Sequence, residues 1–187
     1  MQQPASHILL IGYRGSGKST VGKILANALR YDFVDTDDIV EATAGSSIAA
    51  IFERDGESAF RDLETEAIRS CTADESKTVI SLGGGAILRE ENRHLLRTAG
   101  FVVWLQGSAE NLFQRISQDT TSASRRPKLL HSKQEPNDDR DGYAEVVEIL
   151  RVRTPIYSSL ANFTVETDDK DPEDIVEEII QSLKYSV

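Results

Sequence analysis

The chain has 187 residues, of which 39% are hydrophobic and 28% are charged, a composition typical of one soluble globular domain. Its 31 acidic residues outnumber its 21 basic residues, so the net charge is −10. This balance argues against nucleic acids and membrane surfaces as partners, because both are polyanions.

Strand-like and helix-like patterns alternate along the chain. The run from Ile8 to Ile11 is short and continuously apolar, which is typical of a central parallel strand. Similar strand-like runs follow at 33–34, 78–81, 101–105 and 163–165. Helical patterns occupy 18–30, 38–44, 47–54, 58–73, 90–99, 108–118 and 143–160, and a last helix has Asp171 as its N-cap and Pro172 in its first turn. This alternation predicts a single α/β domain over residues 1–187, with a parallel sheet and helices on both faces.

Residues 119–142 interrupt this alternation, because the segment is polar and contains few apolar residues. So long a stretch without structure of its own is uncommon unless it is a functional loop or disordered. The cluster Arg125-Arg126-Pro127-Lys128 favours a mobile lid that meets an anion, and the alternative is a solvated insertion.

A phosphate-binding motif follows the first strand. The stretch from Gly12 to Ser19, GYRGSGKS, fits the pattern G-x-x-x-x-G-K-[ST] in full and stands between a buried strand and an amphipathic helix. The glycines let backbone N–H groups surround phosphate oxygens, and the helix N-terminus adds a partial positive charge. The motif predicts that Lys18 reaches the β- and γ-phosphates of ATP and that Ser19 is a ligand of Mg²⁺.

Three carboxylates stand close together in FVDTDD, at the end of the second strand. Asp35 and Asp37 lie where ligands bind in parallel sheets, and Mg²⁺ prefers oxygen ligands. A carboxylate here can therefore face the metal, directly or through water. Asp38 suits the start of the helix that follows.

Two arginines and a glycine loop are candidates for the second substrate. Arg61 stands in an amphipathic helix, and Arg153 stands two residues before Pro155, which we expect to bend or end its helix. Gly83-Gly84-Gly85 follows the third strand and predicts close approach of another group to the backbone. If the arginines converge, they form a fork suited to a carboxylate, and the acceptor is a small hydroxylated acid.

Six stretches in this order resemble the shikimate kinases: GYRGSGKST, FVDTDD, AFRDLE, SLGGGA, RRP and RTPIY. The likeness runs from about residue 8 to 184. It implies a P-loop kinase fold with a five-stranded parallel sheet of order 2-3-1-4-5, flanked by helices, with a mobile lid. It also implies Mg²⁺-dependent phosphorylation of the 3-hydroxyl of shikimate by ATP, giving shikimate 3-phosphate and ADP in aromatic amino acid biosynthesis.

The resemblance also implies roles for individual residues. Lys18, Asp37 and Arg126 are the catalytic candidates, with Arg126 closing from the lid onto the phosphates. Asp35 and Ser19 belong to the Mg²⁺ shell. The ATP-binding set is Gly15, Ser16, Gly17, Lys18, Ser19, Thr20, Arg115, Arg126 and Lys170, of which Arg115 and Lys170 lie near the adenine. The acceptor-binding set is Asp37, Arg61, Gly83, Gly84, Gly85 and Arg153, with substrate-binding helices over about 37–73.

The lid departs from the family pattern, in which two leucines directly follow the arginine and proline. Here Lys128 intervenes, giving RRPKLL, and either Arg125 or Arg126 is the lid arginine. We expect Arg126 to be the lid arginine because it directly precedes Pro127.

Two other functions remain open from the sequence. One is a kinase of a different small acceptor, such as gluconate or a nucleoside monophosphate, and the other is a non-catalytic ATP-binding module. The single cysteine, Cys71, cannot form an internal disulfide, no apolar run approaches the roughly 20 residues of a membrane span, and the start MQQPASHILLIG lacks the basic region of a signal peptide. We therefore expect a cytoplasmic protein, and the acidic balance favours a monomer.

Overall fold

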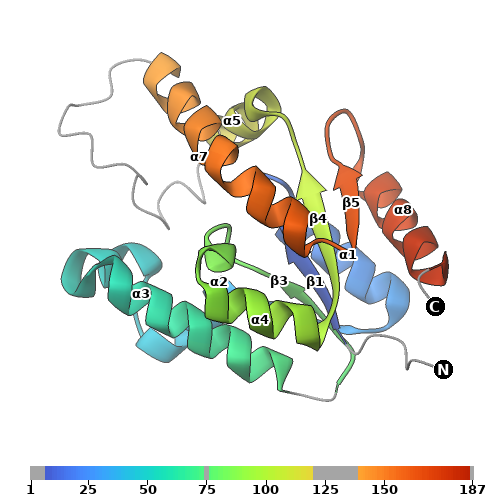
Figure 1. The fold of residues 1–187 in the computed structure, drawn as a ribbon, viewed down its shortest axis with the longest axis horizontal. Helices are drawn as coiled ribbons and strands as arrows, with labels where there is room; N and C mark the ends of the chain where they lie inside the picture. The colour runs from blue at the N-terminus through green and yellow to red at the C-terminus, as the bar shows by residue number, and fades with distance from the viewer. Residues whose placement is uncertain (1–6, 74–75, 120–138, 186–187) are drawn as a thin grey trace.

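The computed structural model describes residues 7–73, 76–119 and 139–185, which form a parallel sheet between two layers of helices (Figure 1). The strands are β1 (His7–Ile11), β2 (Asp32–Asp35), β3 (Thr78–Ser81), β4 (Gly100–Gln106) and β5 (Phe163–Glu166). Their order is β2-β3-β1-β4-β5, and each neighbouring pair is parallel. The predicted fold class and strand order are confirmed.

The helices lie close to the predicted segments. They are α1 (Lys18–Leu29), α2 (Thr36–Ala44), α3 (Ile48–Thr72), the short 3-10 helix η1 (Ala86–Leu88), α4 (Glu90–Ala99), α5 (Ala109–Gln118), α7 (Asp139–Leu160) and α8 (Pro172–Tyr185). The two segments expected at 47–54 and 58–73 both lie within α3, which consists of two helical segments separated at Gly56, where φ is 81° and ψ is 174°.

The central strands are buried on both faces, as their continuous apolar runs predicted. Ile8 and Leu10 point into a core with α1 and α8, while Leu9 and Ile11 point into a second core with α3, α4 and α7. Figure 1 shows these two helical layers on opposite sides of the sheet. Because successive side chains of a strand alternate between faces, one short strand anchors both layers.

The start of α7 differs from the sequence prediction. Helix α7 begins at Asp139, so residues 139–142 belong to a helix, not to the predicted lid. Gly142 packs against α5, because a Cβ built there would lie 2.9 Å from the ring of Phe113. The rest of the predicted lid, 120–138 with Arg125 and Arg126, lies outside the described residues.

Pro155 does not end its helix, because α7 continues through it to Leu160. The helix end predicted at residue 160 is therefore confirmed, and packing offsets the local cost of the proline. Both Tyr157 and Leu160, beyond the proline, are buried against the sheet. Burial of two large side chains offsets the loss of one backbone hydrogen bond.

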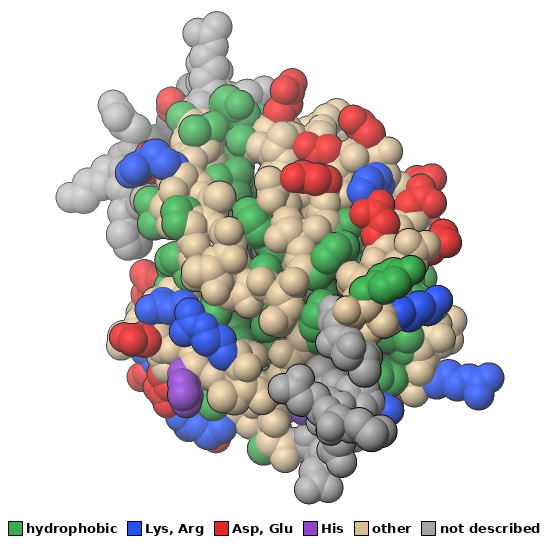
Figure 2. All heavy atoms as spheres, turned by 45° about the vertical axis from the view of Figure 1, so that its right-hand side comes forward, with side chains coloured by type: hydrophobic (Ala, Val, Ile, Leu, Met, Phe, Trp, Pro, Cys, Tyr) green, Lys and Arg blue, Asp and Glu red, His purple; other side chains and the backbone are tan. Residues whose placement is uncertain are grey.

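The surface carries the acidic excess of the composition. Figure 2 shows Asp and Glu side chains gathered mainly on the upper right of the face that it draws. In the part of the chain that the structure describes, no helix combines the length and apolarity needed to cross a bilayer.

Candidate active site

A cavity of about 400 Å³ opens at the carboxyl ends of the strands. Ten of the predicted site residues line it: Gly15, Gly17, Lys18, Ser19, Thr20, Asp35, Asp37, Gly83, Gly84 and Arg115. The sheet order explains why they meet, because β1 lies between β3 and β4 and the loops after parallel strands emerge on the same edge.

The phosphate-binding loop begins this cavity. Gly15 and Gly17 have φ values of 81° and 86°, which favour glycine, and Gly17 is the N-cap of α1. No side chain caps α1, so its first backbone N–H groups are available to an anion. The Nζ of Lys18 donates to the carbonyls of Gly12 (3.0 Å) and Tyr13 (2.8 Å), which holds its charge over the loop.

Ser16 supports the loop from behind and does not line the cavity. Its side chain is 1% exposed, and its Oγ lies 3.4 Å from the Nζ of Lys18. Its predicted contact with ATP therefore stays a prediction.

The acidic stretch divides into two positions with different geometry. The Oγ of Ser19 donates to Oδ2 of Asp35 at 2.7 Å, so the two predicted metal ligands are in contact. Oδ1 of Asp35 accepts from the backbone N–H of Asp37 at 3.1 Å and caps α2. Asp37 stands in the first turn of α2 and lines the same cavity.

The start of α2 corrects a sequence expectation. We expected Asp38 to open this helix at 38–44, whereas the helix begins at Thr36 with Asp35 as its N-cap. An Asp at the N-cap satisfies a free N–H group, and further acidic residues favour the first turn. Because Asp suits both the N-cap and the first turn, the residue types alone did not show at which residue the helix begins.

The contact of Ser19 with Asp35 fits a Mg²⁺ site. Hydroxyl and carboxylate oxygens are hard ligands, and Mg²⁺ uses one or two carboxylates together with water and phosphate oxygens. Among residues 7–73, 76–119 and 139–185, no group of three or more His, Cys, Asp or Glu side chains is arranged to hold a metal. A nucleotide-bound Mg²⁺ does not need such a group.

The glycine loop after β3 is approached from three sides. The backbone N–H of Gly83 donates to Oγ1 of the fully buried Thr36 at 3.1 Å. A Cβ built at Gly84 would lie 3.3 Å from the backbone nitrogen of Arg14, so this loop packs directly on the phosphate-binding loop. The carbonyl of Gly84 accepts from Arg153 Nη1 (3.0 Å) and from the Tyr157 hydroxyl (2.6 Å).

Arg61 reaches the same glycine loop from helix α3. A Cβ built at Gly85 would lie 2.6–2.9 Å from the Arg61 guanidinium, so a side chain at this position would displace the end of Arg61. Arg61 and Arg153 are each 8% exposed, and neither is among the residues that line the cavity. The structure thus brings both predicted clamp residues to adjacent glycines.

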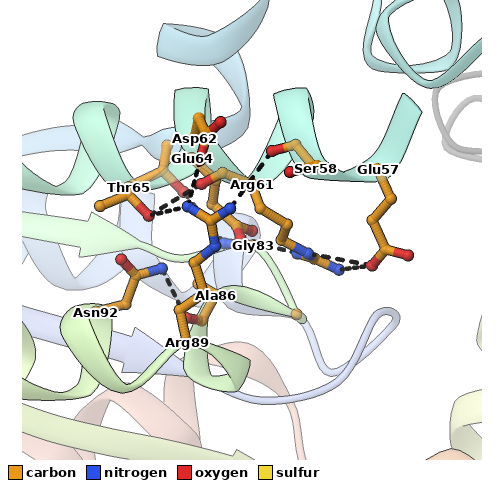
Figure 3. A network of polar contacts seen from close by, with 12 residues as sticks. Glu57, Ser58, Arg61, Asp62, Glu64, Thr65, Gly83, Ala86, Arg89 and Asn92 are labelled. Carbon is orange, nitrogen blue, oxygen red and sulfur yellow. Dashed lines mark hydrogen bonds and ion pairs between the residues drawn. The ribbon is translucent and has the colours of Figure 1, made fainter. Parts of the chain in front are cut away.

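A buried carboxylate holds Arg61 in place. Nη1 of Arg61 donates to Oε2 of Glu64 at 2.8 Å, and Glu64 is 1% exposed. Burial raises the pKa of the Glu64 carboxyl, while the charges of Arg61, Arg153 and Arg89 act in the opposite direction. Figure 3 shows this network, in which Arg89 connects the glycine-loop side to α3 through Thr65, Asp62 and Ser58.

Of the two residues expected near the adenine, Arg115 lines the cavity and Lys170 does not. Arg115 lines the cavity and donates to Oγ1 (3.2 Å) and the carbonyl (2.7 Å) of Thr167. Lys170 pairs with Glu178 at 2.6 Å and is not among the lining residues. The contact of Lys170 with a nucleotide therefore stays a prediction.

The shikimate kinase family model matches residues 14–184 of this chain. The chain belongs to the shikimate kinase family. The shikimate kinase of Rhodopirellula baltica is 38% identical over 97% of this chain and 92% of its own length. That of Symbiobacterium thermophilum is 39% identical over 95% of this chain and 96% of its own.

A solved structure agrees with this assignment. The shikimate kinase from Acinetobacter baumannii, in complex with shikimate, is 33% identical and superposes with a TM-score of 0.86. The superposition covers 98% of this chain and 95% of that structure. Family membership thus extends over the whole sheet and both helical layers.

Sequence reasoning missed several residues at this family's site. Arg14, Ile48, Ser81, Leu82 and Asp119 also line the cavity. Glu64 could have been found, because it stands three residues after Arg61 and therefore on the same helix face. Tyr157 gave no such signal, because its contact with Gly84 joins residues that are far apart in the chain.

Proposed function

We propose that this chain transfers the γ-phosphoryl group of ATP to the 3-hydroxyl of shikimate, giving shikimate 3-phosphate and ADP. Membership of the shikimate kinase family supports this reaction. The position of the Gly83–Gly85 loop is the observation that links this reaction to particular residues of the chain. It lies between the phosphate-binding loop and two buried arginines, so it joins a nucleotide site to a site for an acid.

The nucleotide end supplies positive charge. Lys18 and the N-terminus of α1 hold the phosphates and neutralise the charge that develops on the transferring group. Phosphoryl transfer passes through a loose transition state, so catalysis is mainly positioning and charge stabilisation. On this proposal Lys18 exchanges its two carbonyl contacts for phosphate oxygens.

Ser19 and Asp35 hold Mg²⁺ at this end, Ser19 through its hydroxyl and Asp35 directly or through water. When bound, the metal ion neutralises phosphate charge and helps to orient the nucleotide. The two residues already share a hydrogen bond of 2.7 Å, which fixes both oxygens at one side of the cavity.

The acceptor end orients the nucleophile. Arg61 and Arg153 bind the carboxylate of shikimate, and Gly83–Gly85 provide backbone contacts to the ring. Asp37 hydrogen-bonds the substrate hydroxyls and takes the proton of the attacking 3-hydroxyl as the phosphoryl group arrives. Its position in the first turn of α2, beside Asp35, supports a division of labour between the two carboxylates.

The remaining assignments complete the proposal. Arg126 closes over the phosphates from the polar segment that precedes α7, and Arg115 and Lys170 contact the adenine. We infer a monomer that acts in the cytoplasm, which agrees with the unpaired thiol of Cys71 and the acidic composition. Size-exclusion chromatography with light scattering measures the oligomeric state.

A coupled assay of ADP release tests the reaction. With MgATP present, ADP should form rapidly on addition of shikimate and very slowly without it. Gluconate and nucleoside monophosphates serve as alternative acceptors in the same assay. Equal rates with and without shikimate would overturn the proposal, as would faster turnover of an alternative acceptor.

A further inference from the structure

The guanidinium of Arg61 is held by two carboxylates of its own helix. Nη1 donates to Glu64, whereas Nε and Nη2 both donate to Oε1 of Glu57, at 3.3 Å and 3.2 Å. Figure 3 shows Glu57 facing the end of the Arg61 side chain. The edge formed by Nε and Nη2 is one of the two edges through which arginine binds a carboxylate with two parallel hydrogen bonds.

The two carboxylates differ in how firmly they are fixed. The Glu64 side chain is 1% exposed, whereas that of Glu57 is 64% exposed. An ion pair with an exposed carboxylate shifts an equilibrium by only about two- to fivefold, while breaking a buried pair leaves an uncompensated charge. Glu57 can therefore leave Arg61 easily, and Glu64 cannot.

The local backbone favours release of Glu57. Gly56 interrupts α3 with a φ of 81°, so Glu57 is the first residue of the helical segment that follows. A carboxylate in a first turn is stabilised by the helix dipole even when it has no cationic partner. Apart from its two chain neighbours and the backbone of its own helix, no described residue lies within 4 Å of a Cβ built at Gly56, so the backbone at this break is not packed against another element.

We propose that Glu57 is a displaceable counterion of the acceptor site. Its carboxylate pairs with Arg61 before the acceptor binds and is exchanged for the carboxylate of the acceptor. This inference rests on the proposed function, in which Arg61 binds that carboxylate. Glu57 acts as a specificity-determining residue, because a ligand must bind the Arg61 guanidinium more strongly than the Glu57 carboxylate does.

Removal of Glu57 should therefore tighten the binding of the acid. In calorimetric titrations without nucleotide, Glu57→Gln and Glu57→Ala should each lower the Kd for shikimate by about two- to fivefold, the range of an exposed ion pair. Shikimate methyl ester, which has no charge, should bind both variants and the wild type alike. The gain for shikimate should shrink as salt rises, because the competing pair is exposed.

Glu66→Gln is the matched control. Glu66 is 66% exposed and pairs with Arg69 on the same helix, so the substitution makes the same chemical change away from the clamp. Its Kd for shikimate should equal that of the wild type. Adding Glu57→Ala to Arg61→Lys should change the Kd for shikimate by well below twofold relative to Arg61→Lys alone.

An unchanged or higher Kd in both Glu57 variants overturns the proposal, because Glu57 then supports Arg61 instead of competing for it. A gain with Gln but not with Ala also overturns it, since the new amide would be the cause. An equal decrease in the Kd for the methyl ester also overturns the proposal, because the ester carries no carboxylate to compete with Glu57. If Arg61→Lys itself leaves shikimate binding unchanged, the carboxylate clamp of the proposed function fails instead.

Discussion

The proposed phosphate end of the site is built from one continuous segment, Gly12–Ser19, whereas the proposed acceptor end is built from three separate segments. At the first end, backbone N–H groups and one lysine provide the positive charge. At the second, two arginines from α3 and α7 reach a glycine loop that follows β3. The difference separates a site encoded locally from one assembled by packing, and the two should respond differently to substitution.

The largest effect is expected at the phosphate end. Lys18→Ala removes the charge that strengthens on the transferring group, so turnover should fall by at least about a hundredfold while ATP affinity changes less. The measurement is kcat from ADP release, with ATP binding titrated separately. Lys23→Ala, an exposed lysine of the same helix, is the control. Turnover of Lys18→Ala within about threefold of wild type would refute the assignment of the phosphate loop.

The two carboxylates between the ends should separate in their response to Mg²⁺. Asp37→Asn cannot accept the proton of the hydroxyl, so turnover should fall about 10²–10³-fold at every Mg²⁺ concentration. Asp35→Asn weakens the metal shell, so added Mg²⁺ should restore part of its activity. The measurement is turnover against Mg²⁺ concentration, and the exposed neighbour Asp38→Asn is the control. Rescue of Asp37→Asn but not of Asp35→Asn would reverse the two roles.

The acceptor end should respond in affinity for the acid. Arg61→Lys and Arg153→Lys keep the charge but lose the planar fork, and breaking a desolvated contact typically costs about 2–5 kcal/mol. We expect the lower part of this range, so shikimate affinity falls about 30-fold while ATP affinity barely moves. Arg54→Lys and Arg151→Lys, exposed arginines of the same two helices, are matched controls. Unchanged shikimate binding in both clamp variants would exclude the clamp.

The smallest expected effect concerns Glu64, beneath the clamp. Burial raises its pKa in the folded chain above the ordinary value of 4.5. A raised carboxyl pKa contributes stability below the unfolded pKa, and this contribution is lost as pH rises through the folded pKa. The free energy of unfolding of the wild type minus that of Glu64→Gln should therefore fall as the pH rises above 4.5. Urea denaturation across this range measures the difference, and a difference that rises with pH would contradict the burial effect.

By itself, the sequence determined the phosphate end and the fold class. The motif Gly12–Ser19 carries its whole geometry in adjacent residues, since the glycines, the lysine and the helix start are neighbours in the chain. The continuous apolar runs determined which strands lie in the centre of the sheet, because only strands covered on both faces lack polar alternation.

Only the tertiary structure decided the acceptor end. Arg61 and Arg153 meet at Gly84 and Gly85 because α3 and α7 pack on the same face of the sheet, and no local pattern records that proximity. The same packing carries α7 through Pro155 and buries Glu64 beside Arg61. Local chemistry fixes the interactions of adjacent residues, whereas burial and convergence depend on which distant surfaces the hydrophobic cores bring together.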